Sequence, residues 1–133
     1  MQVLWIDDDS PEEAITLEGV TVYSVQDLAA AESVLSEQSL APCGYVVDLL
    51  VPQGGWGEGE LLADPGIAYI KHMREKWKIS SPVVAYGIVV SDRDRERIAG
   101  AGGDEAFQKD EISLAEVIGR VKDLCGEKGG ADA

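Results

Sequence analysis

The chain has 133 residues, 45% of them hydrophobic, which fits one compact domain with one core. Its 25 acidic and 11 basic residues give a formal net charge of −14 at pH 7, which repels nucleic-acid phosphates and anionic lipid alike, so we expect no direct nucleic-acid binding. No run approaches the roughly 20 apolar residues of a membrane span, and the N-terminal run lacks the basic flank of a signal peptide, so we expect a cytoplasmic protein with no membrane contact.

Short apolar runs alternate with segments of helical period from the start of the chain. Residues 3–6 predict a first strand and residues 20–23 a second. Between them, Ser10 and Glu13 have the spacing of a capping box, and a proline follows the serine, which predicts a short helix over residues 11–17.

The later elements continue this alternation. Residues 27–37 and 67–77 place apolar side chains on one helical face, and residues 112–125 carry a wider apolar stripe that predicts a C-terminal helix. Three further strands are expected at residues 45–47, 82–86 and 105–107. Strand and helix in alternation imply a central five-stranded parallel sheet with helices on both faces.

Two stretches depart from this rhythm. Residues 52–65 are rich in glycine and acid and predict an extended loop. Residues 126–133 have no apolar periodicity, so we expect a disordered tail after a domain that spans residues 1–125. Within the loop, Trp56 is flanked by glycines. Such a tryptophan most often packs back onto its own domain, and the alternative is a lid or docking element near the acids that follow the strands.

Charged residues follow three of the predicted strands. Asp7 and Asp8 end the first strand, Asp48 ends the third, and Lys109 ends the fifth. Carboxyl ends of parallel strands open a crevice at one edge of the sheet, so these groups should converge. Three carboxylates in one place repel unless a cation intervenes, and Mg²⁺ prefers such oxygen ligands. Asp9, which precedes the predicted first helix, is interpreted as a cap or a solvated acid outside the site.

The motifs VLWIDDD (3–9), VVDLLVP (46–52) and AGGDEAFQKD (101–110) resemble the receiver domain of bacterial two-component response regulators over nearly the whole chain. The resemblance implies the flavodoxin-like (βα)5 fold, a three-layer sandwich. It also implies that Asp7 and Asp8 form the acidic pair, that Asp48 is the phospho-acceptor, that the backbone carbonyl of Leu50 completes the Mg²⁺ shell, and that Lys109 holds the phosphoryl group. The implied partners are a histidine kinase or phosphotransfer protein as donor and a downstream effector protein as reader.

The chain departs from the family pattern where the family transmits its signal. Gly87 stands at the position of the family's Ser or Thr, Ile88 at that of its small following residue, and Ala106 at the aromatic switch position. Ser91 offers a substitute hydroxyl, although an N-cap for the next helix is its simpler role. Asp110 stands where the family has proline. One neutral hydrogen bond contributes only about 0.5 to 1.5 kcal/mol, so phosphorylation is easier to predict than the switch.

Three functions therefore remain open. The first is a stand-alone receiver that signals through protein contacts, because no output domain follows in the sequence. The second is a pseudo-receiver, an interaction module that keeps the acids but does not switch. The third is an Mg²⁺-dependent phosphatase with an aspartate nucleophile, but such enzymes carry a second Asp two residues later, where this chain has Leu50.

Three remaining residues have ordinary structural interpretations. His72 has no acid or cysteine at ligand spacing, so we expect a satisfied or solvated side chain. Cys43 and Cys125 lack metal-type spacing, and we expect two free thiols that behave as small apolar residues.

Overall fold

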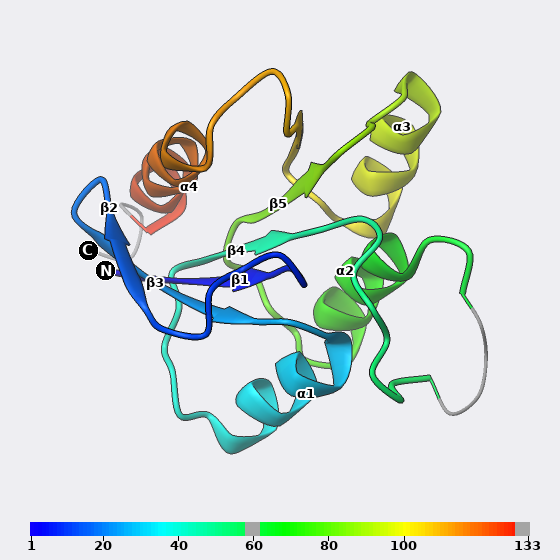
Figure 1. Cartoon of the computed structure of the whole chain (residues 1–133), viewed down its shortest axis with the longest axis horizontal. Helices are drawn as coiled ribbons and strands as arrows, with labels where there is room; N and C mark the ends of the chain where they lie inside the picture. The colour runs from blue at the N-terminus through cyan, green and yellow to red at the C-terminus, as the bar shows by residue number, and fades with distance from the viewer. Residues whose placement is uncertain (58–61, 130–133) are drawn as a thin grey trace.

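The computed structural model describes residues 1–57 and 62–129 and shows a six-stranded sheet between two layers of helix (Figure 1). In sheet order the strands are β2 (Ile15–Leu17), β3 (Val20–Val25), β1 (Gln2–Ile6), β4 (Gly44–Val47), β5 (Val83–Gly87) and β6 (Glu105–Gln108). The helices are α1 (Leu28–Glu37), α2 (Pro65–Glu75), α3 (Asp92–Ala101) and α4 (Leu114–Gly129). Among these described strands, β2 alone runs antiparallel to its neighbour.

Alternation along the central strands divides the core into two. In β1, Leu4 and Ile6 pack on the side that α1, α2 and α3 cover, whereas Val3 and Trp5 pack on the side of α4. The other central strands divide in the same way, because successive side chains of a strand point to opposite faces. The predicted flavodoxin-like three-layer sandwich is therefore confirmed.

The predicted helix over residues 11–17 is wrong, and so is the count of five strands. Ile15–Leu17 forms β2, which pairs with the start of β3 in a hairpin. Glu18 and Gly19 both have positive φ, 52° and 73°, the backbone that a two-residue hairpin turn with the twist of the strands requires. Runs of β-branched residues on both sides of Glu18-Gly19 were the signal for this hairpin, and the capping pattern at Ser10 favoured a helix instead.

The other predicted helices are present. Asp27 caps α1 by accepting from the Ala30 amide at 2.7 Å, and Ser91 forms a capping box with Asp94 at the start of α3, as its N-cap interpretation predicted. The backbone of α4 continues to Gly129, so the disordered tail predicted from residue 126 is wrong as far as residue 129, and residues 130–133 lie outside the described residues. Within the described part of the chain, no helix is both long and apolar enough to cross a membrane.

One carboxylate joins α1 to α2. Oε1 of Glu32 accepts hydrogen bonds from the Tyr69 hydroxyl at 2.8 Å and from Trp77 Nε1 at 2.7 Å, and it lies 2.8 Å from Nε2 of His72. Partial burial raises the pKa of Glu32, but the hydrogen bonds from Trp77 and Tyr69 and the nearby His72 hold it below its ordinary value. His72 is thus satisfied, as predicted, although by an acid on another helix that sequence spacing did not reveal.

The substitution Glu32→Ala should destabilise the fold. It leaves three polar side chains without their shared acceptor, and hydrogen bonds to a charged group contribute about 1.5 to 3 kcal/mol each, so we expect a loss of on the order of 2 to 4 kcal/mol in urea unfolding. Glu37→Ala is the matched control, because Glu37 is an exposed acid of the same helix, and it should change stability by less than about 0.5 kcal/mol. Equal effects of the two substitutions would contradict this role of Glu32.

Candidate functional site

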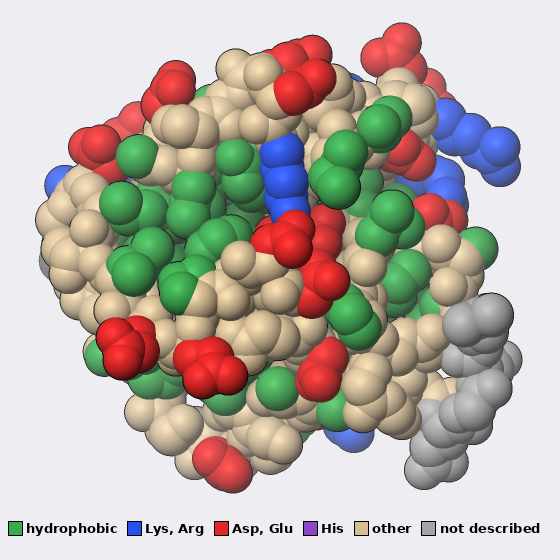
Figure 2. All heavy atoms as spheres, viewed as in Figure 1, with side chains coloured by type: hydrophobic (Ala, Val, Ile, Leu, Met, Phe, Trp, Pro, Cys, Tyr) green, Lys and Arg blue, Asp and Glu red, His purple; other side chains and the backbone are tan. Residues whose placement is uncertain are grey.

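The four charged groups predicted to converge do so at the carboxyl edge of the sheet. Asp7 and Asp8 follow β1, Asp48 follows β4, and Lys109 follows β6. One carboxylate oxygen from each of the three acids lies within 4.8 Å of those of the other two. Figure 2 shows acidic side chains gathered around a basic one near the centre of this face of the molecule.

The carboxylate of Asp7 is fully buried and held on both oxygens. Oδ2 lies 2.7 Å from Nζ of Lys109, and Oδ1 accepts from the Asp9 amide at 2.9 Å. The main chain is also fixed, because the Asp7 carbonyl accepts from the Ser10 hydroxyl at 2.6 Å. Asp7 therefore has one defined orientation, and Ser10 stabilises this turn instead of capping a helix.

Asp48 is the second buried acid, with 7% of its surface exposed. Its amide donates to the Ile6 carbonyl at 2.9 Å, and the Leu50 amide lies 3.5 Å from its Oδ1. Burial and then the charge of Asp7 raise the pKa of Asp48 to about 6, against the opposing effects of Lys109 and the Leu50 amide. Two buried carboxylates thus share one ammonium group, and the site has an excess of negative charge.

The donor set fits a hard divalent cation. Asp7, Asp8 and Asp48 offer oxygens at mutual distances that one ion could bridge, and their excess negative charge is what such an ion would neutralise. Leu50 has its side chain 67% exposed and its amide directed to Asp48; the role of its carbonyl stays a prediction. Asp9 is 76% exposed at the rim, 4.0 Å from Nζ of Lys109. Of its two interpretations, the solvated acid is confirmed and the helix cap is wrong, because no helix begins there.

Gly66 supports the site, and sequence reasoning missed it. A Cβ on Gly66 would lie 2.2 Å from the carbonyl oxygen of Asp48, so only glycine permits this approach of α2 to the loop after β4. The Gly66 amide also donates to the Leu49 carbonyl at 3.0 Å. The sequence does indicate this residue, because Gly66 lies in the first turn of a helix. A glycine inside a helix reduces stability by about 1 kcal/mol relative to alanine, so its presence suggests a close contact.

Where the family has a hydroxyl, this chain has an apolar contact. A Cβ on Gly87 would lie 3.2 Å from both Cγ and Cδ1 of Leu49, so the Leu49 side chain occupies the space beside the end of β5. Ala106 packs against the core shared with α1, α2 and α3, and its carbonyl accepts from Nη1 of Arg95 at 2.6 Å. The hydroxyl of Ser91 is engaged in its helix cap.

Gln108 is a second residue that sequence reasoning missed. Its Oε1 accepts from the Val90 amide at 2.9 Å, and its Nε2 donates to Oδ1 of Asp110 at 2.8 Å. The residue directly before Lys109 therefore holds the loop between β5 and α3. No sequence motif marked it, because the Val90 amide lies 18 residues earlier in the chain and only the fold brings it near.

Trp56 packs on its own domain, the commoner of the two predicted arrangements. Its ring makes edge contacts with Tyr69 at 4.9 Å and His72 at 5.0 Å between centroids. The start of the same loop is bound to α1, since the carbonyls of Pro52 and Gln53 accept from the first amides of that helix at 2.9 and 3.1 Å. The indole thus lies against α2, which does not support the lid hypothesis. Residues 58–61 of the loop lie outside the described residues.

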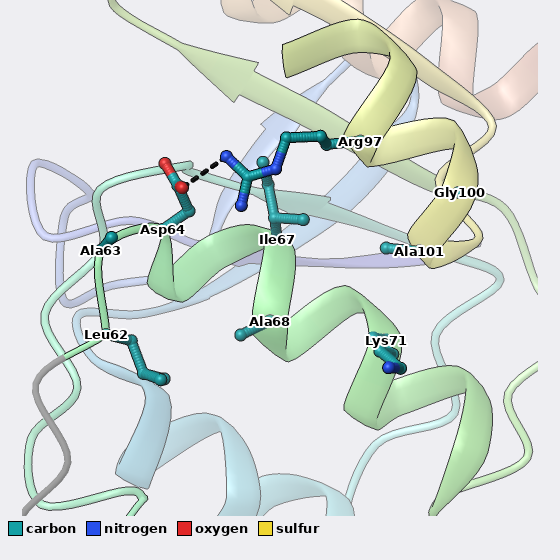
Figure 3. A pocket seen from close by; sticks show the side chains of 9 residues that line it. All are labelled: Leu62, Ala63, Asp64, Ile67, Ala68, Lys71, Arg97, Gly100 and Ala101. Carbon is teal, nitrogen blue, oxygen red and sulfur yellow. Dashed lines mark hydrogen bonds and ion pairs between the residues drawn. The ribbon is translucent and has the colours of Figure 1, made fainter. Parts of the chain in front are cut away.

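A hollow of about 460 Å³ lies between α2 and α3 (Figure 3). Ile67, Ala68 and Ala101 are among its apolar lining, and Arg97 reaches across to pair with Asp64 at one end. Lys71, the first basic residue of the chain, lies at the rim. None of the predicted site residues lines this hollow, so it is separate from the candidate site.

The raised pKa of Asp48 has a measurable consequence for stability. The folded state binds the Asp48 proton more tightly than the unfolded state, so ionisation of Asp48 destabilises the fold as pH rises through about 4 to 6. Without divalent cations, Asp48→Asn should therefore gain stability over wild type by on the order of 2 to 3 kcal/mol between about pH 4 and pH 7 in urea unfolding. Mg²⁺ should reduce this gain. Asp9→Asn is the control, and its curve should stay parallel to wild type; a parallel Asp48→Asn curve would contradict the assignment.

No protein-family model and no curated protein matches the chain. Several solved structures are similar to the chain over nearly its whole length. The receiver domain of the Francisella response regulator 1452 is 23% identical, with 96% of this chain and 98% of that chain covered and a TM-score of 0.70. The BeF3-activated N-terminal receiver domain of RstA from Klebsiella pneumoniae is 16% identical, with 94% and 98% covered and a TM-score of 0.69. The Mn²⁺-bound response regulator Rcp1 is 15% identical, with 94% and 91% covered and a TM-score of 0.63. The chain therefore has the fold of response-regulator receiver domains over nearly its whole length.

Proposed function

We propose that this chain is a receiver domain that accepts a phosphoryl group on Asp48. The observation that carries the proposal is the convergence of Asp7, Asp8, Asp48 and Lys109, from three separate strand ends, on one edge of a receiver fold. A histidine kinase or phosphotransfer protein is the donor, and a downstream effector protein reads the result through protein contacts in the cytoplasm. Transfer to Asp48 and its later hydrolysis are the only chemistry that the chain itself catalyses.

The state of Asp48 suits a nucleophile. With a pKa of about 6, the carboxylate is mostly ionised at neutral pH, yet it is more basic than an ordinary aspartate. In the transfer, an Asp48 oxygen forms the new bond to phosphorus while the bond from phosphorus to the donor's imidazole nitrogen breaks, and the imidazole takes up a proton. Asp48 is 7% exposed, so a small part of its surface is open to the donor.

The neighbouring residues have separate roles. Asp7, Asp8, Asp48 and the Leu50 carbonyl would hold Mg²⁺, which supplies positive charge to the phosphoryl oxygens when bound. The Mn²⁺-bound form of Rcp1, a structure with the same fold, supports a divalent ion here. Lys109 lies 2.7 Å from Asp7 in the unphosphorylated protein, and in the phosphorylated state its ammonium group contacts the phosphoryl oxygens.

Phosphorylation by a small donor tests the proposal. Incubation with Mg²⁺ and acetyl phosphate should give an acid-stable, base-labile adduct of one phosphoryl group in intact-mass spectra, which Asp48→Asn should abolish. Asp8→Asn should slow its formation at least about tenfold, because the site loses a ligand for the cation. Asp9→Asn, at an exposed neighbouring acid, should leave it unchanged. An adduct that persists in Asp48→Asn, or its absence in wild type, would overturn the assignment.

A pseudo-receiver is the second candidate, and the contact between Leu49 and Gly87 is the observation that favours it. No hydroxyl at Gly87 can follow the phosphoryl group, and a switch from 1:99 to 99:1 needs about 5.5 kcal/mol of differential stabilisation. Contacts such as the bond from the Val90 amide to Gln108 would have to supply the coupling in a true receiver.

Beryllofluoride with Mg²⁺, a mimic of the phosphoryl group, separates the two candidates in backbone amide NMR spectra. In a switching receiver, the chemical-shift changes should extend from Asp48 and Lys109 into α3 and β6. In Gln108→Ala, fewer amides of α3 should shift, because the hydrogen bond from the Val90 amide is lost. Shifts confined to the carboxyl edge of the sheet in wild type would establish the pseudo-receiver. Asp123→Ala is a control at an exposed acid of α4 and should not change the pattern.

A further inference from the structure

Two cysteines far apart in the sequence meet on the α4 side of the sheet. Cys43 directly precedes β4, and Cys125 lies in α4. Their sulfurs are 2.7 Å apart across a sequence separation of 82 residues, and the Cys125 thiol also lies 3.0 Å from the Cys43 carbonyl. Neither cysteine is in a disulfide; Cys43 is partly exposed and Cys125 is buried. The sequence predicted free thiols but not that they are neighbours.

The close approach follows from the packing of α4 on β4. Gly44 begins β4, and a Cβ there would lie 2.4 Å from Cγ1 of Val121 and 3.4 Å from the sulfur of Cys125. Because this position has no side chain, the last turns of α4 lie directly against the start of the strand. The two thiols are therefore held together by a tight helix-to-strand contact and not by a mobile loop.

We propose that Cys43 and Cys125 are a reversible redox site. The two thiols form a disulfide with each other when a low-molecular-weight disulfide such as oxidised glutathione oxidises them. The partly exposed Cys43 thiolate attacks the oxidant, which forms a mixed disulfide and releases one thiol. The Cys125 thiolate then attacks the Cys43 sulfur and releases the second thiol. Overall, two protein thiols lose two protons and two electrons, and one disulfide is reduced to two thiols. Sulfurs at 2.7 Å need to approach only a little further to reach the bond length of about 2.05 Å.

The redox site is separate from the acidic site. Cys43 precedes β4 and Asp48 follows it, so the two sites lie at opposite ends of the same strand, roughly 16 Å apart for a strand of this length. The cross-link joins α4 to the start of β4 and leaves the groups at the carboxyl edge in place. The phosphoryl adduct with acetyl phosphate should therefore form equally in oxidised and reduced protein, and failure of either proposal leaves the other standing.

Oxidation of the folded protein with oxidised glutathione tests the site. The intact mass should fall by two hydrogens, both thiols should disappear together in a thiol assay, and the product should remain a monomer on non-reducing gels. The Tm should rise by roughly 10 °C, because the bond closes a long loop in the unfolded chain, and dithiothreitol should reverse it. Cys125→Ala is the matched control: it should retain glutathione on Cys43 and show no rise in Tm.

Two outcomes would overturn the proposal. One is a stable glutathione adduct on Cys43 of the folded wild-type protein without loss of the second thiol. The other is an intramolecular bond that forms no faster in the folded protein than in urea, since thiols held in contact should react far faster than thiols on an unfolded chain.

Discussion

The ion pair between Asp7 and Lys109 is the interaction on which the carboxyl edge of this protein depends. Asp7 is fully buried, and a buried charge without a partner costs about 3 to 5 kcal/mol. Its partner comes from the far end of the chain, 102 residues away, so it is reached only when β1, β4, β5 and β6 are in order. The amide of Lys109 is itself bound to the Gly87 carbonyl at the end of β5, which fixes the position of the ammonium group. The charge at the carboxyl edge therefore depends on the strand order of the sheet, because that order brings Lys109 to Asp7.

Because Lys109 pairs with Asp7, the negative charge of the nearby Asp48 is not fully neutralised. Burial and the Asp7 carboxylate act together on Asp48, and one ammonium group neutralises only one of the two buried acids. This arrangement is unfavourable for folding at neutral pH, since each ionised buried carboxylate raises the electrostatic free energy of the folded state. It is favourable for a site that binds a divalent cation, whose positive charge would in turn attract the phosphoryl oxygens. The destabilising charge and the proposed function therefore have one physical origin.

If the chain is the proposed receiver, signal transmission from this edge would follow contacts that differ from the pattern of response-regulator receiver domains. The family's hydroxyl position is Gly87 here, with Leu49 in the space beside it, and its aromatic position is Ala106, which is partly buried against the core. Gln108 instead connects the residue before Lys109 to the Val90 amide, in the loop that leads to α3. Through this hydrogen bond, the residue next to Lys109 is linked to the loop between β5 and α3.

The order of strands and helices and the residues of the acidic site were open to prediction from the sequence. Hydrophobic periodicity reports which faces are buried. Asp7 and Asp48 each directly follow an apolar strand, and Lys109 follows the less apolar β6, so their convergence depends only on parallel strands. The hairpin of β2 was not predicted, because Ser10 and Glu13 have the spacing of a helix cap. In the structure, the backbone hydrogen bonds of Ile15–Leu17 are made with β3 and not within a helix.

Contacts between distant side chains were decided by the tertiary structure alone. The Glu32 hydrogen bonds, the approach of Gly66 to the Asp48 carbonyl, and the meeting of Cys43 with Cys125 all depend on how closely each helix packs on its neighbours. These distances follow from the shapes of side chains at each interface, including the missing side chain of Gly44. The pattern of polar and apolar residues along the sequence indicates which face of a helix or strand is buried. It does not indicate how closely two buried faces pack.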